Sequence, residues 1–205
     1  MTPHVRAYQP TDLPALYDIC VRTADAGGDA RGQYASDLLM GDLFAAPYAT
    51  LEPEHAHVLD AGDGRVVGYV LGTADTARFV ERYRAEWIPA TAERCPPPAD
   101  PPVTADDVML GLHHRPERML EPAVTAYPAH LHIDLLPGWQ GQGWGRALMA
   151  AFLDGLRAAG VPSVHLGMLA VNTGARAFYA RLGFHPVAEV EPLVYLGRST
   201  APLGR

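Results

Sequence analysis

The stretch from His130 to Gly145 constrains the fold more than any other part of the chain. An apolar strand ends at Pro137 and leads into a turn with glycines at positions 141, 143 and 145. The spacing of the apolar residues that follow predicts an amphipathic helix beginning near Gly143. This order places several free main-chain N–H groups at a helix N-terminus, where the positive end of the helix dipole favours phosphate oxygens.

Two familiar phosphate-binding motifs do not fit this turn. No Gly-Lys-Ser/Thr follows it, and its glycines are spaced G-x-G-x-G rather than the G-x-G-x-x-G of dinucleotide-binding folds. A second pattern begins with a short strand over 164–167. Asn172 then caps a helix whose apolar stripe includes Phe178 and Tyr179, and Gly183 ends it before another strand. The pattern alone therefore predicts strand, phosphate turn, helix, strand, helix and strand.

These two segments together resemble the GCN5-related N-acetyltransferase (GNAT) superfamily. Residues 140–145 are similar to its pyrophosphate loop, and Asn172, Tyr179 and Gly183-Phe184 are similar to its second acetyl-CoA motif. The resemblance is strong over 129–186 and weaker over 5–8 and 65–72. A narrower resemblance, to the acetyltransferase-like domain of O-GlcNAc hydrolases and its stand-alone bacterial relatives, rests on residues 17–20, 22–28, 74–79 and 128–137.

The resemblance implies an α/β fold with a mixed, splayed sheet flanked by helices on both faces, in a single domain over 1–205. It implies acetyl-CoA as co-substrate, with its pyrophosphate on main-chain N–H groups of 140–146. Strand residues along the pantetheine arm would supply an N–H to the thioester carbonyl. The residues expected to hold acetyl-CoA are Leu135, Leu136, Gln140, Gly141, Gln142, Gly143, Trp144, Gly145, Arg146, Asn172 and Tyr179.

Three side chains are candidates for acid–base chemistry. By resemblance, Tyr179 lies near the cofactor sulfur, and its hydroxyl would protonate the departing thiolate; a core tyrosine at helical spacing is the alternative. Asp134 is the first candidate for the base or amine-orienting group, and His132 is the second. Both share one face of the strand with His130. Buried, hydrogen-bonded support of the sheet is the alternative for this face.

Composition excludes several classes of function. A net charge of −7 argues against nucleic-acid binding, which needs a basic surface. No run of eighteen apolar residues predicts a membrane span, and the N-terminus lacks a signal-peptide core. Cys20 and Cys95 are isolated and predict reduced thiols in a cytoplasmic protein. No metal site is expected, because the adjacent His113 and His114 lack a third ligand and are interpreted as solvated.

The rest of the chain predicts local elements around this core. Thr11 is expected to cap a first helix, a second helix is expected over 36–46, and a hairpin is expected around 60–64. Residues 73–128 form an insertion relative to a minimal acetyltransferase, with helices and a proline-rich loop. The insertion is expected to be a lid beside the substrate cleft, with surface decoration or a dimer contact as alternatives.

The sequence thus predicts an N-acetyltransferase that moves an acetyl group directly to an amine on a small molecule or peptide, without a covalent enzyme intermediate. No nucleophile motif such as G-x-S-x-G is present. The alternative is a catalytically silent acyl-CoA-binding or protein-interaction module, because some members of the narrower group look like pseudo-enzymes. The acceptor and a homodimer are left open.

Overall fold

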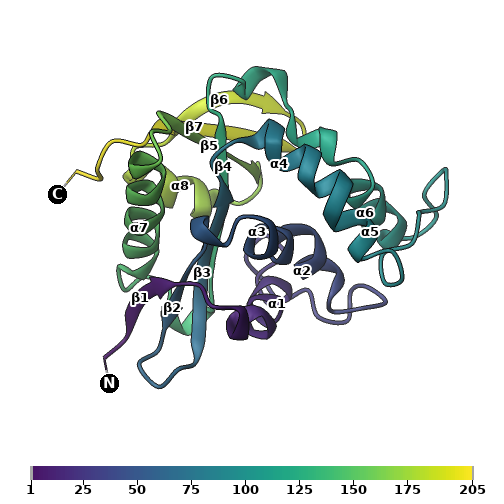
Figure 1. Ribbon diagram of the computed structural model, residues 1–205, viewed down its shortest axis with the longest axis horizontal. Coiled ribbons are helices and arrows are strands. Elements are labelled where there is room, and N and C mark those ends of the chain that lie inside the picture. Colours follow the sequence, from purple (N-terminus) through teal and green to yellow (C-terminus); the bar gives the residue numbers. More distant parts are fainter. Residues whose placement is uncertain (1, 205) are drawn as a thin grey trace.

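The computed structural model describes residues 2–204, and a seven-stranded mixed sheet runs through it (Figure 1). The strand order is β1-β2-β3-β4-β5-β7-β6, in which β4 and β5 pair in parallel and the other neighbours pair antiparallel. The strands are β1 (His4–Ala7), β2 (His57–Asp60), β3 (Val66–Thr73), β4 (Ala129–Leu135), β5 (Ser163–Leu169), β6 (His185–Val190) and β7 (Leu193–Ser199).

The sheet opens in its middle, between β4 and β5. β4 pairs with β3 over its length, from Leu135 opposite Gly68 to His130 opposite Thr73. It pairs with β5 only through Ala129 and His130. Beyond His130 the two strands diverge, so the main-chain edge of residues 131–135 has no strand partner on that side. This confirms the expected splayed sheet.

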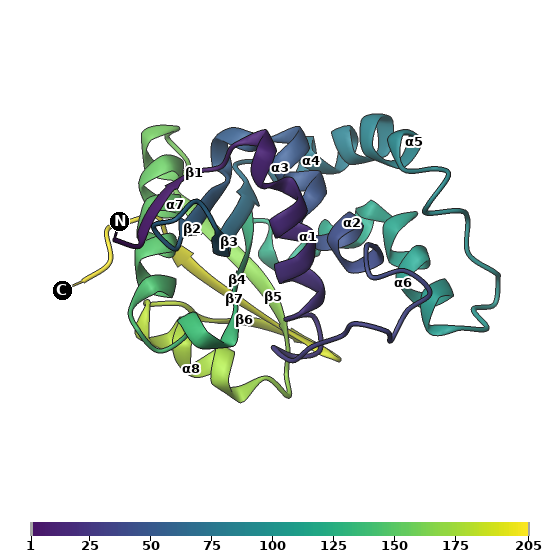
Figure 2. The same ribbon diagram turned by 90° about the horizontal axis from the view of Figure 1, so that it is seen from below.

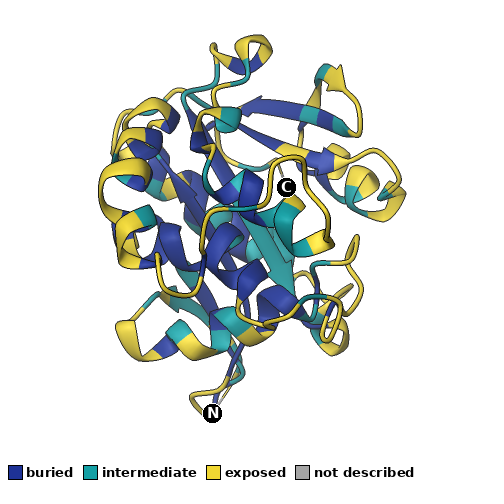
Figure 3. Ribbon diagram, turned by 90° about the vertical axis from the view of Figure 1, so that its right-hand side faces the viewer, coloured by how far each residue is buried: buried dark blue, intermediate teal, exposed yellow. Residues whose placement is uncertain are grey.

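Helices cover both faces of the sheet (Figure 2). On one face, Phe152 of α7 (Trp144–Ala158) packs so closely on Gly72 that a Cβ there would lie 2.5 Å from its ring. On the other face, Tyr48 of α3 (Ala46–Leu51) contacts His132 of β4. Strand β3, which lies inside the sheet, is buried along its whole length, and this explains its continuous apolar sequence. Figure 3 shows the buried parts of the ribbon gathered in the interior of the molecule. The predicted fold class is therefore confirmed.

The two helices that the motifs predict are present with the expected ends. Gly143 precedes α7 with a φ of 88°, and Gly160 follows it with a φ of 76°. Asn172 caps α8 (Thr173–Arg181), because its Oδ1 accepts the Ala175 N–H at 3.0 Å, and Gly183 follows with a φ of 82°.

Two local predictions near the N-terminus are wrong. Thr11 does not cap the first helix: a 3-10 turn, η1 (Pro10–Asp12), precedes α1 (Leu13–Val21), and Asp12 accepts the Gln9 N–H at 2.8 Å. The helix expected over 36–46 is instead α2 (Leu39–Phe44), which is followed directly by α3. Pro47 explains the break, because proline has no N–H to continue a helix but fits its first turn.

Residues 73–128 contain short helices that pack beside α2 and α3. They are α4 (Thr76–Arg82), the π-turn η3 (Tyr83–Trp87), α5 (Ile88–Ala90) and α6 (Ala105–His113), followed by the 3-10 turns η4 (Pro116–Met119) and η5 (Pro122–Val124). Two further 3-10 turns, η2 (Pro53–His55) and η6 (Pro137–Trp139), precede β2 and α7. The stretch 95–102 is an irregular loop, as its prolines predict.

One buried group, Asp42, ties this segment to the rest of the fold, and a second, His113, joins parts of the segment to one another. The Asp42 carboxylate on α2 accepts the Tyr17 hydroxyl at 2.6 Å and the Arg94 guanidinium at 2.9 Å. His113 is also fully buried, with its ring nitrogens 2.9 Å from the Tyr83 hydroxyl and 3.1 Å from the Thr91 hydroxyl. The expectation that His113 is solvated is therefore wrong, because α6 turns it into the core.

Within the described part of the chain, no helix combines the length and apolar character needed to cross a membrane. Residues 2–204 also contain no group of three or more His, Cys, Asp or Glu side chains suited to a metal ion.

Candidate active site

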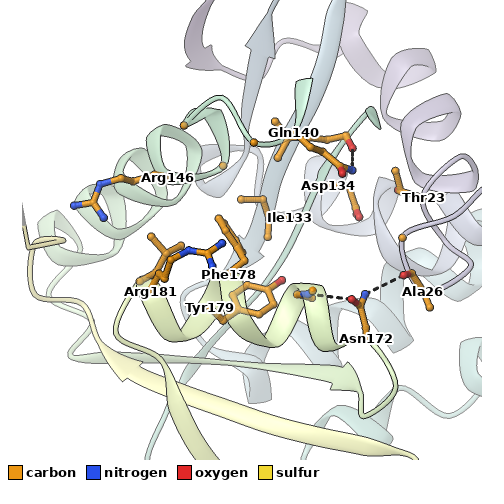
Figure 4. A pocket seen from close by; sticks show the side chains of 18 residues that line it. Thr23, Ala26, Ile133, Asp134, Gln140, Arg146, Asn172, Phe178, Tyr179 and Arg181 are labelled. Atoms are coloured by element: carbon orange, nitrogen blue, oxygen red, sulfur yellow. Dashed lines mark hydrogen bonds between the residues drawn. The ribbon is translucent and has the colours of Figure 1, made fainter. Parts of the chain in front are cut away.

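A cavity of about 680 Å³ lies where β4 and β5 diverge (Figure 4). Its walls come from four parts of the chain. These are the turn after α1, the end of β4, the glycine turn with the start of α7, and α8 with the residue that caps it. The divergence of the strands thus creates the space, and the two predicted motifs line it.

Most of the residues expected to hold acetyl-CoA line this cavity: Leu135, Gln140, Gly141, Gly143, Gly145, Arg146, Asn172 and Tyr179. Three do not. The Leu136 N–H donates to the Val67 carbonyl of β3 at 3.0 Å, so it is not available to a ligand. The Gln142 side chain donates to the Gly138 carbonyl at 2.8 Å and the Trp144 side chain packs partly buried against the core, so these two residues could offer a ligand only their main-chain N–H groups.

The glycines of the turn serve two different purposes. Gly141 and Gly143 have φ values of 72° and 88°, and a Cβ at either position would meet no atom within 4 Å. Backbone conformation, rather than crowding, therefore explains them. Gly145 lies inside α7 without a positive φ, and a Cβ there would lie 3.0 Å from the Phe178 ring. Close packing of α7 on α8 therefore explains this glycine.

The start of α7 presents unpaired donors to the cavity. The first helical hydrogen bond runs from the Ala147 N–H to the Gly143 carbonyl at 3.1 Å, so the preceding amides of the first turn have no partner within the helix. The Arg146 side chain points away from the cavity in Figure 4 and donates to the Gly204 carbonyl. Arg181 of α8 adds a cation that the sequence reasoning missed. This end of the cavity suits an anion.

The open edge of β4 continues the line of donors. Main-chain groups of an antiparallel strand point alternately to its two sides. Because the Leu136 N–H points to β3, those of Leu135 and Ile133 point to the opposite side, where the cavity lies. The Leu135 carbonyl on this edge accepts the Gln140 side-chain N–H at 2.8 Å. The sequence predicted that the N–H groups of Leu135 and Leu136 lie on this edge. Because main-chain groups alternate along the strand, the N–H groups on this edge are those of Leu135 and Ile133 instead.

Asp134 is the carboxylate of the cavity. It lies opposite Tyr69 in the register of β3 and β4, and the Tyr69 hydroxyl donates to its Oδ2 at 2.7 Å. Burial raises the pKa of Asp134, and the Tyr69 hydrogen bond opposes part of that rise. Burial raises the pKa of Tyr69 far more, so Tyr69 stays protonated and remains a donor.

Tyr179 shares the cavity with Asp134, and its hydroxyl points into it in Figure 4. Burial, together with the nearby charge of Asp134, raises its pKa, so the phenol keeps its proton. The hydroxyl has no hydrogen-bond partner among residues 2–204, whereas a tyrosine that serves only the core usually finds one. Its O–H is therefore free to donate into the cavity.

His132 does not line the cavity, although it is two residues from Asp134 on the same strand face. It belongs to a chain of hydrogen bonds in which the Tyr48 hydroxyl lies 3.2 Å from His132 Nε2 and 2.8 Å from His130 Nε2. His130 Nδ1 in turn lies 2.8 Å from the Thr76 hydroxyl, which donates to the Pro128 carbonyl. Burial lowers the pKa of His132 to about 4. For His130 and His132 the structure fits sheet support.

The protons in this chain of hydrogen bonds can be counted. Thr76, Tyr48 and the two neutral imidazoles carry one proton each, and four hydrogen bonds need one each. Every bond receives a proton only if Thr76 donates to Pro128, His130 to Thr76, Tyr48 to His130, and His132 to Tyr48. The donors in this chain of hydrogen bonds therefore all point the same way, from His132 towards Pro128.

Two parts of the cavity differ from what the sequence predicts. None of its lining residues comes from 73–128, so the structure does not place this segment over the cavity as a lid. The wall opposite α8 comes instead from Thr23, Ala26 and Gly27 in the turn after α1. That wall had no sequence signal beyond a glycine-rich loop, because only the tertiary fold brings it to β4.

Comparison with known proteins gives this site a context. The model of the acetyltransferase (GNAT) family matches residues 109–184, which include β4, the glycine turn, α7 and α8. The crystal structure of SsHAT is 60% identical to this chain, covers 98% of it and 100% of that chain, and superposes with a TM-score of 0.96. The chain belongs to the GNAT acetyltransferase family. It is therefore an enzyme of an acyltransferase family, and acetyl-CoA is the co-substrate of that family.

More distant similarities agree with the fold. PH1933 from Pyrococcus horikoshii OT3 is 14% identical, covers 96% of this chain and 98% of that chain, and has a TM-score of 0.61. A mycothiol acetyltransferase of Beutenbergia cavernae is 54% identical over 52 residues, which are 25% of this chain. The match spans only 18% of the length of that relative.

Proposed function

We propose that this GNAT acetyltransferase moves an acetyl group from acetyl-CoA directly to an amine of a small molecule or peptide. One observation carries the proposal: a single cavity holds unpaired amides of α7 at one end and the side chains of Asp134 and Tyr179. Anion-binding donors and a proton donor–acceptor pair are what acetyl transfer from acetyl-CoA requires.

The chain's own groups would divide the work of binding. The first N–H groups of α7 and the left-handed turn at Gly141 and Gly143 would hold the pyrophosphate, with Arg181 as a nearby cation. The N–H groups of Leu135 and Ile133 on the open edge of β4 would pair with the pantetheine arm and the thioester carbonyl. An N–H on that carbonyl would stabilise the negative charge that develops on its oxygen during attack.

Asp134 and Tyr179 would move the protons. The Asp134 carboxylate would orient the amine and take its proton as the carbon–nitrogen bond forms. Tyr179 would donate its proton to the sulfur as the carbon–sulfur bond breaks. Cys20 and Cys95 do not line the cavity, and burial raises the pKa of both thiols, that of Cys95 to about 12. This supports direct transfer rather than a thiol nucleophile.

The narrower resemblance to the acetyltransferase-like domain of O-GlcNAc hydrolases and their stand-alone relatives also belongs to the proposal. It rests on the sequence segments given above and adds the possibility of a catalytically silent protein. Such a protein would bind coenzyme A through the same groups, so binding does not distinguish it from an enzyme.

The test measures binding and turnover on the same protein. Isothermal titration with coenzyme A should give a one-to-one complex, and Gly143→Trp, which replaces a residue with a φ of 88°, should abolish it. Thiol release from acetyl-CoA should then be followed across a panel of primary amines and short peptides. Acetyl transfer to at least one amine supports the enzyme, whereas tight binding without transfer to any of them supports the silent module.

A further inference from the structure

The turn over residues 23–28, here called the strap, forms the cavity wall opposite α8. It is held internally by three main-chain hydrogen bonds, from Asp25 N–H to Gly28 at 3.0 Å, from Gly28 N–H to Asp25 at 2.7 Å, and from Gly27 N–H to Thr23 at 3.1 Å. Ala26 at its tip has a φ of 49°, a left-handed conformation that non-glycine residues rarely adopt. The strap is therefore a small, strained unit.

One side chain joins the strap to the opposite wall. Asn172 Nδ2 donates to the Ala26 carbonyl at 3.1 Å, while Asn172 Oδ1 accepts the Ala175 N–H at 3.0 Å (Figure 4). Among residues 2–204, this is the hydrogen bond that links the strap to α8 and its flanking loop. Asn172 thus fixes the distance between the strap and the helix that carries Tyr179.

Helix capping alone does not explain why this residue is an asparagine. Serine, aspartate and asparagine cap helices about equally well through their side-chain oxygen. Serine has its donor and acceptor on one oxygen next to Cβ and ionised aspartate has no donor, so of the three only asparagine has a separate N–H that reaches the carbonyl across the cavity while its oxygen caps the helix. The second contact uses the group that distinguishes asparagine from the other capping residues.

We infer that Asn172 is a positioning residue that latches the strap across the cavity, and that release of this latch governs how fast coenzyme A exchanges. The second half of the inference rests on the proposed function. The strap residues around Ala26 and Gly27 are exposed, and a single hydrogen bond holds them to the far wall, so local opening costs little. Opening would move one whole wall of the cavity.

The first test needs no ligand. Hydrogen exchange of the Asp25, Gly27 and Gly28 amides should be about fivefold faster in Asn172→Ser, the equivalent of about 1 kcal/mol for one lost hydrogen bond. The Ala175 amide should be unchanged, because serine still caps α8. Asn172→Ala should accelerate both sets. Strap amides that exchange equally in Asn172→Ser and the unmodified protein, or that are unprotected in both, would overturn the latch.

The second test follows coenzyme A leaving the protein by stopped flow. Asn172→Ser should raise the dissociation rate about fivefold. Gly27→Ala should raise the dissociation rate as well, because alanine rarely adopts the φ of 98° that Gly27 has in the strap. Its Cβ would lie 3.9 Å from Asn172, an ordinary contact, so the side chain of Asn172 should not be displaced. This variant loosens the strap without altering the latch side chain.

The outcomes separate the inference from the function on which it rests. Faster dissociation in Asn172→Ser but not in Gly27→Ala would mean that Asn172 contacts the ligand directly, and it would overturn control by the strap. Unchanged dissociation in both variants would do the same. If the unmodified protein does not bind coenzyme A, the proposed function fails, whereas the exchange experiment still decides whether the latch exists.

Discussion

Acidification should destabilise this fold before most carboxylates become protonated. Burial lowers the pKa values of His57, His113, His130, His132 and His165, and those of His113 and His132 fall to about 4. A histidine in an unfolded chain has a pKa of about 6.5. Between these values the unfolded chain binds protons that the folded protein does not, so stability is complete above pH ~6.5 and is lost as the pH falls.

The two histidines with a pKa of about 4 set the magnitude. Each contributes about 1.4 kcal/mol per pH unit, so together they remove about 3 kcal/mol per unit and about 7 kcal/mol between pH 6.5 and 4. The other three act in the same direction. Asp134 acts against them, because its raised pKa favours proton uptake by the folded state. Since domains are stable by about 5–15 kcal/mol, unfolding is expected near pH 4–5.

Urea unfolding followed by tryptophan fluorescence between pH 7.5 and 4.5 would measure this slope. In His113→Gln the slope should fall by the contribution of one proton. A free energy of unfolding that stays constant from pH 6.5 to 5 would refute the argument, because it would mean that these histidines are not buried as neutral groups.

Three further predictions concern the site. Tyr69→Phe removes a hydrogen bond to the Asp134 carboxylate, so the acid limb of the pH dependence of kcat/KM should move up by about 1–2 pH units; an unshifted limb would exclude Asp134 as the titrating group. Tyr179→Phe should lower kcat about tenfold or more while titration calorimetry gives unchanged coenzyme A affinity, and full turnover would remove its role as acid. Gly145→Ala should lower the free energy of unfolding in urea by about 1–3 kcal/mol, because its methyl group meets the Phe178 ring; undiminished stability would show that α7 and α8 separate freely.

The sequence predicted those parts of the fold whose causes are local. The cap at Asn172 and the glycines at 143 and 183 act through their own neighbours in the chain, and each is found as expected. The helix expected over 36–46 is shorter than predicted, because α2 ends at Phe44 and α3 begins at Ala46 with Pro47 in its first turn. Local sequence signals therefore predicted that these elements form, and the nearest proline or glycine determined where they end.

The site was predicted less completely, because parts of it depend on contacts between distant residues. Leu136 lies next to Leu135 in sequence, yet the register with β3 turns its N–H to Val67. His132 shares a strand face with Asp134, yet Tyr48 of α3 holds it in the sheet interior. The roles of Asp134, Tyr179 and the glycine turn stay predictions that the proposed experiments test.

The strap has a consequence for what similarity to this protein can mean. The family match covers residues 109–184, whereas the strap lies in the first thirty residues of the chain. A homologue that shares only the matched segment would have a counterpart of Asn172 without the Ala26 carbonyl that it bonds, so the inferred latch would not carry over to it. Divergence before residue 30 would therefore be the place to look for changes in how fast such proteins exchange their acyl donor.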